Sequence, residues 1–257
     1  MKSEKRYVII IKVRVVCPKI FFSEAKMDEL AYVKNNLDEL RAEIDSLSRQ
    51  YGREVTLVAV TKSGSDEELI ELCKSGALDI GENRPSELRR RGDLLKDAGL
   101  TPRLHEIGNL QRNKVKMIIE SVSLIHSLDN MALALEIDKQ ARKIGRRVPV
   151  LIEVNSAREE QKDGVAPEDV EDFFLKAREL SGISIAGLMT MGPVCDAPEE
   201  IRPYFRLTRE LYDRLNRTYG FDGGILSMGM SDSYKVAIEE GSTLVRVGRK
   251  LFNKRLI

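Results

Sequence analysis

Residues 55–81 read VTLVAVTKSGSDEELIELCKSGALDIG and contain a strand, a helix and a second strand in succession. Val55–Thr61 is apolar and rich in β-branched residues, and Leu78–Gly81 has the same character over a shorter length. Between them, Asp66–Ser75 has the length and composition of a helix. Two strands that are joined through a crossover helix pair in parallel. This stretch therefore predicts a parallel β/α fold.

The alternation of strand and helix continues to the C-terminus, after an amphipathic lead helix that runs from about Met27 to Gly52. Apolar residues recur at helical spacing in this lead helix: Leu30, Val33, Leu37, Leu40 and Ile44. The predicted strands are Val55–Thr61, Leu78–Gly81, Arg103–Ile107, Val122–Ser127, Val148–Asn155, Ile183–Met191, Ile225–Met228 and Thr243–Val247. The helices predicted between them are Asp66–Ser75, Pro85–Lys96, Gln111–Glu120, Asn130–Ile144, Pro167–Leu180, Glu199–Tyr219 and Asp232–Glu240.

Eight strand–helix units in about 200 residues, with no Gly/Ser linker between them, match a closed (β/α)8 TIM barrel. We therefore expect an α/β fold with a single barrel domain over residues 27–257. An open doubly wound sheet fits this count less well. A division into two α/β half-domains near Gly145 is the alternative that strand counting leaves open.

The charge balance and the cysteines exclude several classes of protein. The 42 basic and 41 acidic side chains nearly cancel, so we expect no nucleic-acid partner and no anionic membrane surface as a partner. Cys17, Cys73 and Cys195 lie far apart, with no C-x-x-C motif and no neighbouring histidine. This spacing predicts neither a disulfide framework nor a zinc site, and it favours the reducing cytoplasm.

Residues 1–26 form an N-terminal extension to which the sequence assigns no role. Its apolar stretch, Tyr7–Cys17, is interrupted by Lys12 and Arg14 and is too short to span a bilayer. No small-residue cleavage site follows it cleanly, as a signal peptide would require. The same residues are also compatible with an edge strand.

Lys62 directly follows the first predicted strand, at the end of the run LVAVTK. Its amine would project at the barrel mouth, where the active sites of such barrels lie. Apolar surroundings disfavour the ammonium form of a lysine, and a neutral amine attacks an aldehyde to form a Schiff base. Taken alone, Lys62 fits better as a lysine that only marks the exit of the strand to solvent.

The loops after the last two strands have the composition of a phosphate site. Residues 227–231 read SMGMS, and residues 246–249 read RVGR. Barrels of this kind often bind phosphate between these two loops. Because the eighth strand of a closed barrel pairs with the first, the phosphate would lie next to Lys62, which points to a phosphate-bearing aldehyde. Ser231 and Asp232 would equally serve as an N-cap for the following helix.

Arg246 lies inside the eighth strand, and a buried arginine needs a partner. One interpretation pairs it with a carboxylate such as Glu82 or Glu106. In the other, its guanidinium donates to a ring nitrogen, which must then be unprotonated. Further polar residues follow the second and third strands and extend the rim: Asn83, His105, Asn109, Gln111, Asn113 and Lys114. A lone histidine such as His105 is more often a core residue than a base.

The strings VAVTK, GEN, H-x-IG-x-LQ-x-NK, GLMTMGP, SMGMS-D and GSTLVRVG occur in this order and spacing. Together they resemble the pyridoxal 5′-phosphate homeostasis protein family, over about Met27 to Phe252. The resemblance implies a fold type III pyridoxal-phosphate barrel, like the N-terminal domain of alanine racemase, with the cofactor on Lys62 as a Schiff base. It also implies that Arg246 faces the pyridine nitrogen. The further cofactor-binding residues that it implies are Asn83, Met189, Ser227, Gly229, Ser231, Gly248 and Arg249.

The sequence departs from the family pattern at several positions. Arg84 and Pro85 follow GEN, where an aromatic and a small residue are common. Asn109 stands in place of a frequent histidine, and Arg249 and Asn253 stand in place of a usual Thr and Gly. These departures leave the roles of Asn109 and Arg249 open.

The resemblance implies a cytoplasmic protein that buffers pyridoxal phosphate or delivers it to apoenzymes, as a monomer or a weak dimer. An arginine partner weakens the ring as an electron sink, which favours binding over catalysis. The chain ends soon after Arg246, so we expect no second domain over the mouth. The alternatives are a slow racemase that uses Lys62 and a rim residue such as His105, an aldolase with a phosphorylated substrate, and a scaffold that binds partner proteins.

Overall fold

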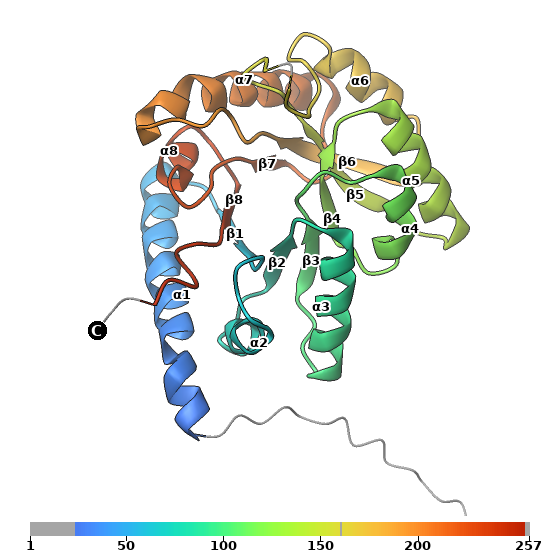
Figure 1. Cartoon of the computed structure of the whole chain (residues 1–257). Coiled ribbons are helices and arrows are strands. Elements are labelled where there is room, and N and C mark those ends of the chain that lie inside the picture. Colours follow the sequence, from blue (N-terminus) through green and yellow to red (C-terminus); the bar gives the residue numbers. More distant parts are fainter. Residues whose placement is uncertain (1–23, 160, 255–257) are drawn as a thin grey trace, which may run out of the picture.

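Eight parallel strands close into one barrel in the computed structural model, which describes residues 24–159 and 161–254 (Figure 1). The strands follow one another around the barrel in chain order, and β8 pairs with β1 to close it. The described strands are β1 Thr56–Val60, β2 Asp79–Glu82, β3 Arg103–Glu106, β4 Leu124–Leu128, β5 Val148–Glu153, β6 Ile183–Met189, β7 Ile225–Ser227 and β8 Leu244–Val247. The predicted (β/α)8 barrel is confirmed, and the division into two half-domains near Gly145 is wrong.

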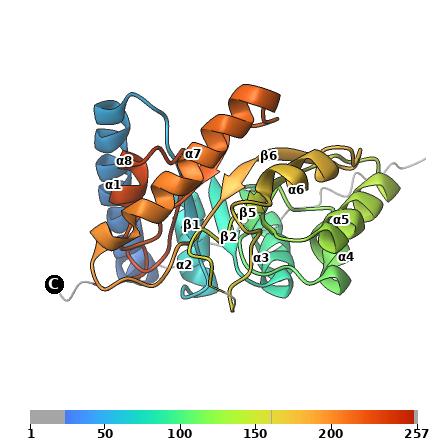
Figure 2. The same cartoon turned by 90° about the horizontal axis from the view of Figure 1, so that it is seen from above.

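The helices surround the ring of strands (Figure 1), and in the second view α1 and α5 lie on opposite sides of the strands (Figure 2). The described helices are α1 Glu24–Tyr51, α2 Asp66–Lys74, α3 Pro85–Asp97, α4 Val115–Ile118, α5 Met131–Lys143, α6 Val170–Ala177, α7 Arg202–Tyr219 and α8 Tyr234–Glu239. Two 3₁₀ turns precede α4 and α7, namely Arg112–Lys114 and Pro198–Ile201. None of the helices in the described part of the chain is long and apolar enough to cross a membrane.

Most predicted elements differ from the observed ones by a few residues at their ends, and three of these differences bear on the predictions above. The helix expected over Gln111–Glu120 is a 3₁₀ turn followed by the single turn α4. The last helix begins at Tyr234, and its N-cap is Ser233, so the expectation that Ser231 and Asp232 cap it is wrong. The lead helix α1 begins at Glu24, three residues before the predicted start of the domain. The apolar stretch Tyr7–Cys17 lies outside the described residues.

The apolar core has two parts, because each strand of the barrel is buried on both faces. The larger part lies between the strands and the helices, and it includes the predicted apolar residues of α1 from Val33 to Ile44. The smaller part lies inside the barrel: Val58, Leu124, Leu151, Ala186, Met189 and Leu244. The rest of the barrel interior is polar, and the candidate site is built on it.

Candidate functional site

The predicted site residues come from strands that are neighbours in the barrel. In the order β6, β7, β8, β1 and β2, these strands or the turns after them carry Met189, Ser227, Arg246, Lys62 and Asn83. Met189 is directly opposite Ser227 in the strand register. The closure of β8 onto β1 places Lys62 beside the loop that follows Arg246. The structure therefore places these residues on five neighbouring strands: Lys62 and Asn83 are exposed on the turns at the mouth, and Met189, Ser227 and Arg246 are buried inside the barrel.

Lys62 is exposed on the turn that follows β1, two residues after Val60. This turn packs against the end of the chain: a side chain on Gly64 would place its Cβ 2.6 Å from the Phe252 ring. Asn36 of α1 donates to the carbonyl oxygen of Leu251 at 3.1 Å and so secures the same terminal segment. The backbone that carries the Lys62 amine is thus fixed from two sides.

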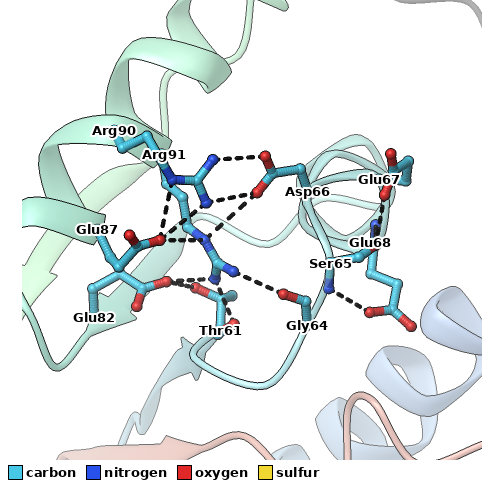
Figure 3. A network of polar contacts seen from close by, with 10 residues as sticks. All are labelled: Thr61, Gly64, Ser65, Asp66, Glu67, Glu68, Glu82, Glu87, Arg90 and Arg91. Carbon is cyan, nitrogen blue, oxygen red and sulfur yellow. Dashed lines mark hydrogen bonds and ion pairs between the residues drawn. The ribbon is translucent and has the colours of Figure 1, made fainter.

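A buried arginine from α3 binds the backbone of this turn (Figure 3). Arg91 Nη1 donates to the Thr61 carbonyl at 2.5 Å, and its Nη2 donates to the Gly64 carbonyl at 2.7 Å. Arg91 Nη1 also lies 2.7 Å from Glu82 Oε1, and both side chains are almost fully buried. The Thr61 hydroxyl donates to the same carboxylate. Arg91 therefore brackets Lys62 through the carbonyls on either side of it.

The loops after β7 and β8 are joined to each other at the mouth. The amide of Gly248 donates to Ser231 Oγ at 3.4 Å, and Arg249 forms an ion pair with Asp232. Gly229 has a φ of +92°, and a Cβ there would lie 2.5 Å from that of Ala237. The predicted phosphate-binding residues therefore lie together, although the Arg249 side chain is itself exposed and paired.

Arg246 is buried inside the barrel, where β8 places it in register with Val58 of β1. Its Nη1 donates to Ser227 Oγ at 2.5 Å and to the Ser227 carbonyl at 3.1 Å, and its Nη2 donates to the Thr190 carbonyl at 3.2 Å. Burial lowers the pKa of Arg246 to about 10. A guanidinium has five N–H donors and no acceptor, so Arg246 can only donate to a group at the mouth.

The pairing of Arg246 with a nearby carboxylate, one of the two interpretations of its burial, is wrong. Glu82 pairs with Arg91 instead. Glu106 has no hydrogen-bond partner for either carboxylate oxygen within the described residues. The acidic group whose charge acts on Arg246 is Glu153 of β5, and burial raises the pKa of Glu153 to about 7.

Other predicted residues occupy different environments. Asn83 is exposed after β2, whereas Met189 is 1% exposed and packs inside the barrel. His105 does not lie on the rim: it is buried in the barrel interior, because β3 turns that side chain inward to Asp79 and His126. The remaining rim residues are exposed on the loop after β3: Asn109, Gln111, Asn113 and Lys114.

Ser227 is fully buried, and its hydroxyl is shared between Arg246 and His126. Its direct contact with a phosphate group stays a prediction. In the structure its hydroxyl orients Arg246.

Sequence reasoning missed Arg91, which holds the turn of Lys62, and four buried polar residues of the barrel strands and their ends: Asp79, His126, Glu153 and Thr190. Asp79, His126 and Glu153 are polar residues inside short apolar strands, and such residues signal an inward-facing site in a closed barrel. Arg91 gives no such signal, because an arginine on an amphipathic helix is usually exposed. Within the described ranges, no cluster of His, Cys, Asp and Glu has the arrangement of a metal site.

Glu106 is the last residue of β3, and its carboxyl group is buried. It is in register with Glu82 on the neighbouring strand β2. Burial, with the charge of Glu82 nearby, raises the pKa of Glu106 to about 8. Between pH 4.5, the ordinary pKa of the group, and about pH 8, the Glu106 carboxyl group is ionised in the unfolded chain but stays protonated in the folded chain. Glu106 therefore lowers the free energy of unfolding as pH rises through this range, by up to about 1.4 kcal/mol per pH unit.

We expect Glu106→Met to be more stable than the parent protein at pH 8, with a difference that shrinks toward pH 5. Urea unfolding at several pH values measures it. Glu120→Met, at an exposed position, serves as the control and should leave the pH dependence unchanged. A Glu106→Met protein whose stability varies with pH as the parent's does would show that Glu106 is ionised in the folded state.

The chain matches the family model described as alanine racemase, N-terminal domain, over residues 35–255. It is 46% identical over 199 residues to the pyridoxal phosphate homeostasis protein of Aquifex aeolicus, covering 77% of this chain and 86% of the relative. It is 33% identical over 225 residues to the protein of the same name from Helicobacter pylori, covering 86% and 98% of the two chains.

Among solved structures, the chain is similar to PipY of Synechococcus elongatus, whose structure was determined with pyridoxal phosphate bound. The TM-score is 0.76 at 28% sequence identity, and the match covers 86% of this chain and all of PipY. The range matched by the family model includes all eight strands and the loops from which the mouth is built.

Proposed function

The chain belongs to the pyridoxal phosphate homeostasis protein family, and from this membership and the geometry of the mouth we propose that it binds pyridoxal 5′-phosphate for cofactor homeostasis. The observation that carries the proposal is the position of an exposed lysine, a buried arginine and two joined glycine- and serine-containing loops in one sector of the mouth. PipY, which shares the fold at 28% identity, binds this cofactor.

The residues of the mouth fit the three polar parts of the cofactor. Lys62 presents a primary amine, and the loops that hold Ser231 and Gly248 present a hydroxyl and backbone amides suited to a phosphate. Arg246 presents donors alone, which suit an unprotonated pyridine nitrogen. Pyridoxal phosphate supplies an aldehyde, which condenses with a neutral primary amine to form a C=N bond with loss of water.

We infer that Lys62 is the attachment residue and that the site stores and releases the cofactor. Arg91 holds the backbone on both sides of Lys62, so the amine is presented from a fixed turn. The exposure of Lys62 leaves its linkage open to water and to other amines, which suits exchange. Because Arg246 keeps the pyridine nitrogen unprotonated, the site does not favour the carbanion chemistry of amino-acid conversion.

A racemase that uses His105 as its second acid–base group receives no support from the geometry. His105 is 4% exposed and is hydrogen-bonded to Asp79 and His126 within the barrel. It therefore does not face a substrate at the mouth.

The proposal extends to delivery of the cofactor to pyridoxal-phosphate-dependent apoenzymes in the cytoplasm, by a monomer or weak dimer. Cys73 and Cys195 are free thiols, as is usual in a reducing compartment. Incubation of the loaded protein with an apoenzyme, with the recovered activity of that enzyme followed over time, tests the delivery.

Binding itself is tested with the purified protein and pyridoxal phosphate. We expect a visible absorption band that saturates at one cofactor per chain, and one borohydride-reduced adduct in the intact mass. Peptide mapping should place the adduct on Lys62. Saturable binding without a reducible adduct would contradict the covalent attachment, and the lack of saturable binding would contradict the proposed function.

A further inference from the structure

The sequence contains two histidines, and the structure joins them to each other inside the barrel. His105 Nδ1 lies 3.0 Å from His126 Nε2, and His105 Nε2 lies 2.9 Å from Asp79 Oδ1. At the other end, His126 Nδ1 lies 3.2 Å from Ser227 Oγ, which accepts from Arg246. These side chains come from β2, β3, β4, β7 and β8, and all are buried.

The chemistry of the two ends determines the direction of every hydrogen bond between them. Arg246 has only donors, so Ser227 Oγ accepts from it and turns its own proton toward His126 Nδ1. Burial lowers the pKa of His126 well below its ordinary value, and the charge of Arg246 acts in the same direction, so this imidazole is neutral. With Nδ1 accepting, its proton is on Nε2 and is donated to His105 Nδ1.

The series of hydrogen bonds that begins at Arg246 ends on the carboxylate of Asp79. His105 accepts at Nδ1 and so donates from Nε2 to Asp79. Burial opposes the ionisation of Asp79, but hydrogen bonds from His105 and Arg103 outweigh it and lower the pKa of this carboxyl group. Asp79 and His105 line a cavity of about 270 Å³, together with residues at the starts of other strands such as Arg103 and Thr243. These hydrogen-bonded side chains thus extend from the N-terminal end of the barrel toward the mouth.

We propose that Asp79, His105, His126 and Ser227 form a one-way hydrogen-bonded chain, in which every donor points from Arg246 toward Asp79, and that this chain positions Arg246 for the cofactor's pyridine nitrogen. This proposal rests on the proposed function. Arg246 is buried without a carboxylate on its guanidinium among the described residues. Hydrogen bonds in a chain polarise one another, so the negative end at Asp79 compensates part of the charge at Arg246. The members of the chain are positioning residues, and Arg246 is the one that meets the ligand.

The first test needs no cofactor. Two-bond ¹H–¹⁵N correlation spectra of the apoprotein at neutral pH distinguish the imidazole tautomers, and two histidines give two resolved patterns. We expect both imidazoles to be neutral and protonated at Nε2. An Nδ1-protonated tautomer or an imidazolium at either position would overturn the one-way chain, whether or not the protein binds pyridoxal phosphate.

The second test measures positioning with His126→Phe, which breaks the chain at its centre with a ring of similar size. We expect the dissociation constant for pyridoxal phosphate to rise by about tenfold, equivalent to about 1.4 kcal/mol, and the absorption maximum of the bound cofactor to shift. His126→Gln retains a donor and an acceptor and should lie between the parent and His126→Phe in both measurements.

Ser127→Ala is the matched control, because Ser127 is the next residue on β4, is buried and has no hydrogen-bond partner for its hydroxyl in the described part of the chain. It should leave both the affinity and the spectrum unchanged. A folded His126→Phe protein with parental affinity and spectrum would overturn the positioning role. If His126→Phe does not fold, the tautomers of the parent protein still decide the direction of the chain.

Discussion

Replacement of Lys62 by alanine is expected to abolish the borohydride-reducible adduct of pyridoxal phosphate and its visible absorption band. The Lys62 amine is the group proposed to form the covalent bond, and no other lysine lies on the turn between β1 and α2. Because Lys62 is exposed, its side chain contributes little to the packing of the barrel. The far-UV circular dichroism spectrum and the urea midpoint should therefore stay within error of the parent values.

Exposed lysines also react with free pyridoxal phosphate, so the measurement is made at one cofactor per chain. Lys114→Ala and Lys235→Ala, each at an exposed position, are the matched controls and should retain the full adduct. A Lys62→Ala protein that forms a stoichiometric reducible adduct would move the attachment to another lysine. Peptide mapping would then identify that lysine.

Replacement of Arg91 by methionine is expected to cost about 3–5 kcal/mol of the free energy of unfolding, as is typical when one partner of a buried ion pair is removed. Glu82 would stay buried without its cation, and the carbonyls of Thr61 and Gly64 would lose their donor. Since these carbonyls flank Lys62, the turn should also loosen. We therefore expect slower formation of the adduct, in addition to the loss of stability in urea unfolding.

The neighbouring Arg90 provides the control, because the two arginines lie side by side on α3 (Figure 3). Arg90 pairs with Asp66 and Glu87 at the surface, and such exposed pairs contribute at most about 1 kcal/mol. Arg90→Met should therefore leave the adduct rate unchanged.

The double variant Arg91→Met/Glu82→Met separates the two effects of Arg91. It removes the unpaired charge and should recover much of the stability, but not the adduct rate. An adduct rate that recovers together with stability would show that Arg91 supports the fold and does not position Lys62.

The course of the chain around the barrel could be predicted from the sequence, because it depends on local patterns. The run LVAVTK, followed by helical spacing and then by Leu78–Gly81, indicates a parallel unit on its own. Eight such units imply closure, and closure places Lys62 beside the loop after Arg246. The sequence alone therefore indicates both the lysine proposed as the attachment residue and the loops proposed to bind the phosphate.

The partners of the buried polar residues could not be predicted in the same way. Strands that are buried on both faces are apolar on both, so their pattern does not say which side chains face the barrel interior and which face the helices. The sequence therefore predicts His105 on the rim and leaves Glu82 open as a partner of Arg246, whereas the structure buries His105 inside the barrel and pairs Glu82 with Arg91.

The sequence by itself determined the (β/α)8 fold, the family and the position of Lys62, because each depends on residues close together in the chain or on the order of motifs. The tertiary structure alone decided that Arg91 holds the turn of Lys62 and that His126 meets Ser227, 101 residues away. It also decided that Glu106 is left without a partner among the described residues. The reason is physical: a hydrogen bond depends on ångström distances between side chains from separate strands and helices. Those distances exist only after the barrel has closed.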